Sequence, residues 1–117
     1  MMYVTVEDVK LFAHIKPSDL GYDSEDAFNA FIQKIIDYAE KMIDDYINMS
    51  FSGEPPAIVK FVTIQLCSNI LHIILQRKIA PSTQANEYVI RIVSPEAFTD
   101  DLKELLNKYR KIGVHIG

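Results

Sequence analysis

The sequence predicts a mostly α-helical protein, a small bundle of about four helices with one extended segment or short hairpin before the last helix. Apolar residues recur at three- and four-residue steps along most of the 117 residues, which is the spacing of one helix face. Residues that favour helix starts precede several of these runs, and prolines and glycines interrupt them. With 49% hydrophobic and 24% charged residues, the composition fits a single domain that spans residues 1–117.

The first helix is expected over residues 6–14. Thr5 stands before it and Asp8 follows three residues later, a pattern close to a capping box. Residues 16–24, "KPSDLGYDS", contain a proline and a glycine and are typical of a loop. The apolar side of this helix is expected to comprise Val6, Val9, Leu11, Phe12 and Ile15.

The second helix is expected over residues 25–48 and is strongly amphipathic. Asp23 or Ser24 is a suitable N-cap, because a side-chain oxygen there accepts a hydrogen bond from a free backbone N–H. The outer face carries charges, with Asp37 and Lys41 in the favourable order for a pair four residues apart. The buried side is expected to comprise Phe28, Phe31, Ile32, Ile35, Ala39, Met42, Ile43 and Tyr46.

The third helix lies within "PPAIVKFVTIQLCSNILHIILQRK", residues 55–78, the most apolar stretch of the chain. A membrane span needs about 20 mostly apolar residues, and this stretch is long enough. A lipid-facing helix, however, has no need of the narrow polar stripe that a helical wheel shows here. We therefore expect a central helix buried by its own domain, and partly by a neighbouring subunit, rather than by a membrane. The polar stripe comprises Gln65, Ser68, Asn69, His72 and Gln76.

Residues 86–93, "NEYVIRIV", are rich in β-branched and aromatic side chains, which favours an extended segment. Alternation would place Tyr88 and Ile90 on one side and Val89 and Arg91 on the other. A single strand in a helical protein has no ladder partner, so we expect it to pair with another chain or with a second, weaker strand. Tyr88, Val89 and Arg91 are accordingly the candidates for contacts with a neighbouring subunit.

The last helix is expected over residues 100–112, with Thr99 as its N-cap. Acidic residues at its start and the basic cluster Lys108, Arg110 and Lys111 at its end both suit the helix dipole. The same basic cluster is alternatively a contact for an acidic partner surface. The buried side of this helix is expected to comprise Leu102, Leu105, Leu106, Tyr109 and Ile112.

The sequence contains no arrangement of residues that points to catalysis or metal binding. His14, His72 and His115 lie far apart on different elements. No two of them have the close spacing on one helix face that is typical of metal ligands. Cys67, the single cysteine, falls on the apolar side of the third helix, where nothing lowers the pKa of a thiol. We therefore expect no enzyme activity, no metal and no cofactor.

The formal net charge of −4 argues against a general nucleic-acid binder, which would normally carry a basic face. A helix-turn-helix DNA binder would also need a basic recognition helix, and none is apparent. A lone cysteine and the lack of a secretory leader favour a reducing cytosol.

Four stretches of the chain are similar to one known family. They are the opening "VTVEDVKLF", the run "IIDYAEKMIDDYINMSF", the proline-led "PPAIVKFVTIQLCSNIL" and the ending "SPEAFTDDLKELLNKYRK", which closes on a Tyr-Arg pair. Through them the chain resembles the phage gp6-like head–tail connector (head-completion adaptor) family over almost its whole length.

This resemblance implies a structural virion protein of a tailed virus or provirus. Members form a homo-oligomeric ring of about a dozen subunits beneath the portal protein, where closed symmetry makes each interface identical. The ring meets a tail or stopper protein, and DNA passes through it without specific binding. The resemblance implies a place in the virion after assembly in the host cytoplasm, with no membrane and no cofactor. Candidate portal contacts are Tyr109, Arg110, Lys111 and Ile112.

A second interpretation stays open from the residues alone. The same helical pattern is typical of a small dimeric regulator or an antitoxin-like module that binds a partner protein. This alternative predicts a stable dimer, whereas the connector predicts either a large oligomer or a monomer that forms rings on a portal.

Overall fold

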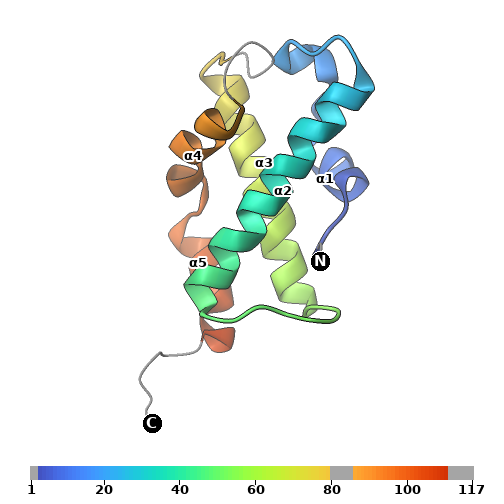
Figure 1. Ribbon diagram of the computed structural model, residues 1–117. Helices are drawn as coiled ribbons and strands as arrows, with labels where there is room; N and C mark the ends of the chain where they lie inside the picture. The colour runs from blue at the N-terminus through green and yellow to red at the C-terminus, as the bar shows by residue number, and fades with distance from the viewer. Residues whose placement is uncertain (1–2, 80–85, 111–117) are drawn as a thin grey trace.

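The computed structural model describes residues 3–79 and 86–110, and within these ranges it is helical with no strand (Figure 1). The predicted mostly α-helical class is therefore confirmed. The elements are α1 (Val6–Ala13), the 3-10 turn η1 (Pro17–Leu20), α2 (Glu25–Ile47), α3 (Ala57–Gln76), α4 (Asn86–Ala97), α5 (Asp100–Leu106) and the 3-10 turn η2 (Asn107–Tyr109).

The two long helices α2 and α3 cross at the centre of the molecule (Figure 1). α1 lies on one flank of this pair and α4 on the other, while α5 lies beside the C-terminal end of α2. α3 packs against α1, α2, α4 and α5, which confirms its expected central place. The largest fully buried side chains come mainly from the two long helices: Phe28, Phe31, Ile32, Ile35, Ile36, Ile43, Ile47, Leu66, Ile70, Leu71 and Ile74.

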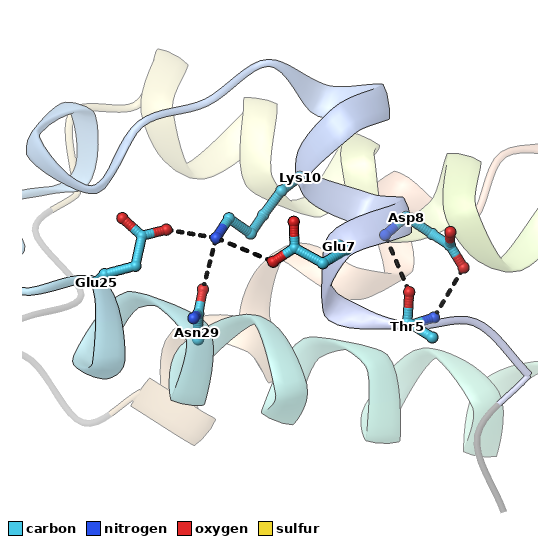
Figure 2. A network of polar contacts seen from close by, with 6 residues as sticks. All are labelled: Thr5, Glu7, Asp8, Lys10, Glu25 and Asn29. Atoms are coloured by element: carbon cyan, nitrogen blue, oxygen red, sulfur yellow. Dashed lines mark hydrogen bonds and ion pairs between the residues drawn. The ribbon is translucent and has the colours of Figure 1, made fainter.

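Both of the first two helices begin at a side-chain cap. At α1 the backbone N–H of Asp8 donates to Thr5 Oγ1 at 3.1 Å, and the N–H of Thr5 donates to Asp8 Oδ2 at 3.0 Å, which completes a capping box (Figure 2). At α2 the cap is Ser24, whose Oγ accepts from Ala27 N at 3.1 Å. Thr99 stands at the N-cap of α5, but its side chain makes no capping hydrogen bond.

The expectation of an extended segment over residues 86–93 is wrong, because these residues begin α4. The same residues also carry a helical period, and the structure buries the side chains that share one helix face. Burial against α3 outweighs the modest strand preference of β-branched residues. The buried side chains of α4 are Val89, Ile90, Val93, Ser94 and Ala97.

The polar stripe of α3 binds the C-terminal ends of both flanking helices. Asn69 Nδ2 donates to the carbonyl oxygen of Ala97 at 3.0 Å, at the end of α4. His72 Nε2 lies 3.0 Å from the carbonyl oxygen of Ala13, at the end of α1. Gln65 Nε2 in turn donates to Asn69 Oδ1 at 3.0 Å. The last carbonyls of a helix lack intrahelical partners, so the stripe satisfies groups that α1 and α4 leave free.

Candidate interaction surfaces

Two of the residues considered for chemistry, Cys67 and His72, lie on α3, and His14 lies at the end of α1. Among them no three His, Cys, Asp or Glu side chains lie close enough to hold a metal ion. Cys67 is a free, fully buried thiol in α3, and burial raises its pKa far above the usual range, so it stays protonated at neutral pH. His14 is the exposed left-handed C-cap of α1 and His72 bonds to Ala13, while His115 lies outside the described residues.

α3 is the one described helix that is long and apolar enough to cross a membrane, by length and composition alone. Half of its most apolar window is buried inside the fold, as in the core helix of a bundle. Its partly covered face carries the polar stripe that holds α1 and α4.

The first candidate surface is on the outer face of α4, and we call Tyr88, Arg91 and Ile92 the α4 surface. Tyr88 is 63% exposed and Ile92, one turn further on, is 49% exposed. Arg91 stands between them, is exposed, and forms no ion pair within the part of the chain that the structure describes. Val89 points into the core at 5% exposure, so of the three predicted contact residues only Tyr88 and Arg91 are accessible.

The second candidate surface is on the opposite flank, and we call Leu11, Phe12 and Phe61 the α1 surface. Leu11 is 70% exposed, which corrects the expectation that it belongs to the buried side of α1. Phe12 is also partly exposed, and its ring packs edge-on against Phe61 of α3, with 6.5 Å between ring centroids. The five apolar residues assigned to this short helix are too many for one face. Their number alone therefore indicated that some of them would be exposed.

Of the C-terminal basic cluster, Arg110 is engaged within the chain. Arg110 Nε donates to the carbonyl oxygen of Tyr46 at 3.1 Å, near the end of α2. The guanidinium also lies over the Tyr46 ring, 4.5 Å from its centroid, and Tyr46 Oη donates to Asn107 Oδ1 at 2.6 Å. Arg110 therefore holds η2 against α2, a positioning role that the sequence did not reveal.

The remaining predicted portal contacts have different surroundings. Tyr109 is half-buried against the core, and the ammonium group of Lys108 lies 5.2 Å from the centroid of its ring. Lys111 and Ile112 lie outside the described residues. Leu102 and Leu106 are buried as expected, but Leu105 is 39% exposed.

Lys10 connects α1 to the start of α2 (Figure 2). Its ammonium group forms an ion pair with Glu25, donates to Asn29 Oδ1 at 3.0 Å, and lies 3.4 Å from Glu7 Oε2. The hydrogen bond to Glu25 is the main cause of the raised pKa of Lys10, so the ammonium form is stabilised in the fold.

The residues before α1 are anchored to the second half of α2 through Tyr3. Its backbone N–H donates to the buried carboxylate of Glu40, and its hydroxyl donates to Asp44 Oδ1 at 2.6 Å. The same hydroxyl accepts from Phe51 N at 3.1 Å. Burial raises the pKa of both carboxyl groups, although the hydrogen bonds from Tyr3 partly oppose that effect.

Comparison with known proteins adds no relative: no family model, no curated protein and no solved structure matches the chain. The connector resemblance therefore stays a prediction from the sequence.

Proposed function

We propose that the protein is a structural head–tail connector that forms a ring under the portal of a tailed virus or provirus. The observation that carries this proposal is the pair of exposed apolar surfaces, the α1 surface and the α4 surface. The helices α1 and α4 lie on opposite flanks of the α2–α3 pair (Figure 1). The sequence resemblance supports it independently.

The two surfaces suit a head-to-tail contact between copies. The α1 surface adjoins the exposed carboxylates of Asp8 and of Glu7, which lies 3.4 Å from the ammonium group of Lys10. The α4 surface carries the guanidinium of Arg91, which has no ion pair among the described residues. Apolar groups would cover each other while opposite charges face across the rim. A contact between unlike surfaces leaves one of each free on every dimer, so it repeats until the rotation closes a ring.

The contact between the α1 surface of one copy and the α4 surface of the next is expected to be weak in isolation. Covering half-exposed side chains such as Phe12 and Ile92 contributes roughly 1 kcal/mol each, while association costs at least about 4 kcal/mol of lost freedom. A portal that binds several copies at once would raise their effective concentration. We therefore expect a monomer in solution and a ring on the portal.

The net charge of −4 is compatible with a DNA channel through such a ring. A basic channel would hold the phosphates by releasing counterions, whereas an acidic protein lets DNA slide without specific binding. The proposed place of action is the virion, after assembly in the host cytoplasm, with contacts to the portal and to a tail or stopper protein.

The test is the mass of the protein by light scattering, alone and with its portal protein. We expect a monomer alone and a ring-sized addition to the portal, which Ile92→Ser should abolish because it removes the exposed aliphatic side chain of the α4 surface. Leu105→Ser is the matched control: this side chain is also partly exposed but belongs to α5, away from both surfaces. No added mass on the portal would refute the proposal.

A dimeric regulator or antitoxin-like protein-binding module is the second candidate. The apolar pair Tyr88 and Ile92 favours it, because a ridge on one helix can pack against its own copy about a two-fold axis. In that case light scattering would show a dimer whose mass is unaffected by the portal and reduced to that of a monomer by Ile92→Ser.

A further inference from the structure

We propose that the groove between α2 and α4 binds an acidic helical segment of a partner protein. This inference does not depend on the connector function. The groove has a volume of about 310 Å³ and is lined by Lys34, Asp37, Tyr38, Lys41, Glu87 and Arg91.

Lys34 and Lys41 are available for a partner, and Arg91 is available wherever the α4 surface is uncovered. Lys34, Lys41 and Arg91 are exposed, and none forms an ion pair within residues 3–79 and 86–110. Elsewhere Lys10, Lys60 and Arg77 are each paired with a glutamate. The groove thus holds a local excess of positive charge on a chain whose net charge is −4.

The two carboxylates of the groove do not neutralise this excess. Asp37 accepts a hydrogen bond from Gln33 Nε2 at 2.9 Å, on its own helix. Glu87 is exposed on α4 and forms no ion pair in the described part of the chain. Three cations therefore face two carboxylates, and the cations stand at the ends and on the opposite wall of the groove.

The spacing of the groove residues specifies the chemistry of the partner. Lys34 and Lys41 are seven residues apart on α2, which corresponds to about 10.5 Å along a helix. Two glutamates seven residues apart on a partner helix have the same separation. Tyr38 lies between the lysines and is half-buried, so it offers an aromatic surface to an apolar residue placed midway between the glutamates.

The same residues favour a protein over a nucleic acid. A nucleic-acid strand carries a phosphate at every step, so some phosphates would face Asp37 or Glu87. A peptide can place carboxylates only where the cations stand and neutral side chains opposite the acids. Specificity of this kind comes from repulsion of the wrong ligand as much as from attraction of the right one.

The experiment measures binding to three labelled probes by fluorescence anisotropy at low ionic strength, because exposed charges are screened by salt. The first probe is a short helical peptide with two glutamates seven residues apart and a leucine midway. The second peptide has the same composition with the glutamates adjacent, and the third probe is a single-stranded oligothymidylate. We expect the first peptide to bind at least about tenfold more tightly than either of the others.

The variants locate the binding to the groove. Lys34→Gln/Lys41→Gln should weaken binding of the first peptide at least about tenfold, whereas Lys16→Gln/Lys78→Gln should change it less than about twofold. The control pair removes the same charge from exposed lysines outside the groove. Equal losses in the two pairs, or an oligothymidylate that binds as tightly as the first peptide, would overturn the proposal.

Discussion

α1 and α4 both pack against α3, but apolar burial and polar contacts hold the two flanks of the molecule in different proportions. In α1 only Val9 and Ala13 are buried. The helix is also held by the ion pair of Lys10 with Glu25, by the contact of His72 with its last carbonyl, and by the hydrogen bonds of Tyr3 just before it. In α4 four apolar side chains are fully or nearly buried: Val89, Ile90, Val93 and Ala97. Its polar contacts are fewer, the hydrogen bond from Asn69 to the carbonyl oxygen of Ala97 and the exposed ion pair of Arg77 with Glu96.

This difference predicts how each flank responds to change. Apolar burial is non-directional and has no titrating group, so the α4 flank should respond mainly to lost side-chain volume. Hydrogen bonds and ion pairs need a partner in a given protonation state, so the α1 flank should respond to lost partners and to pH.

The largest expected effect is a cavity under α4. Ile90 is 1% exposed, and Ile90→Ala should lower the free energy of unfolding by about 2–5 kcal/mol, because the removed methyl groups leave space that the neighbours fill only in part. Ile92→Ala makes the same chemical change on the exposed side of the same helix and should lower it by less than about 1 kcal/mol. Urea unfolding followed by circular dichroism measures both, and equal losses would contradict the helical placement of this segment.

The next effect is a loss of stability at alkaline pH, which arises at Tyr3 and at Tyr22, whose ring packs against Phe28 and Phe31 of α2. Burial raises the pKa of Tyr3 and of Tyr22 from 10.0 to about 12, with the hydrogen bond to Asp44 as a further cause for Tyr3. The folded state keeps both protons where the unfolded chain has lost them, so this stability is full below pH 10 and is lost as the pH rises through about 12. The loss amounts to roughly 1–2 kcal/mol per tyrosine, because nearby solvent screens part of the effect.

Urea midpoints measured across that pH range test this assignment. The double variant Tyr3→Phe/Tyr22→Phe removes both titrating hydroxyls and should show a much shallower fall. If the fall is as steep in the double variant as in the unchanged protein, the alkaline loss arises from other groups.

The sequence predicted the long helices well because their patterns are strong. α2 spans more than five turns with a clear amphipathic period, and α3 is recognisable by its length and its narrow polar stripe. The caps at Thr5 and Ser24 depend on local chemistry. α4 was assigned to the wrong class because eight residues rich in valine and isoleucine fit both periods. The decisive factor was the face of α3 that buries Val93, which is a tertiary contact.

Because residues 86–93 were assigned to a strand, the α4 surface and the groove were not predicted as the structure has them. As a strand, the segment would place Tyr88 and Ile90 on the same side; as a helix, it exposes Tyr88 and buries Ile90. The groove with Lys34 and Lys41 exists only when α4 lies beside α2, so it was not predictable from either segment alone. Arg110 was recognised as basic, but its contact with Tyr46 spans 64 residues and needs the whole fold.

A smaller effect on stability distinguishes Tyr3 from Tyr22. Tyr3→Phe removes a hydroxyl that donates to Asp44 and accepts from Phe51 N, so it should lower the free energy of unfolding by about 1–3 kcal/mol. The Tyr22 hydroxyl is buried and has no hydrogen-bond partner among the described residues, so Tyr22→Phe should be neutral or slightly stabilising near neutral pH. Thermal unfolding of the two variants measures the contrast, and a larger loss for Tyr22→Phe would reverse the assignment.

The smallest effect on stability is expected at Lys10, whose ion pair and hydrogen bonds are partly exposed to water. Lys10→Met keeps most of the side-chain stem but removes the bonds to Glu25 and Asn29, and should cost about 0.5–1 kcal/mol. Because these contacts join α1 to α2 rather than forming the core, the loss should appear as faster amide hydrogen exchange in α1 with little change in α4. Lys34→Met is the control, since that lysine has no ion pair in the described part of the chain.

Added salt should reduce the difference in stability between Lys10→Met and the unchanged protein, since screening weakens exposed ion pairs. A salt-independent loss would mean that Lys10 holds α1 by packing of its aliphatic stem.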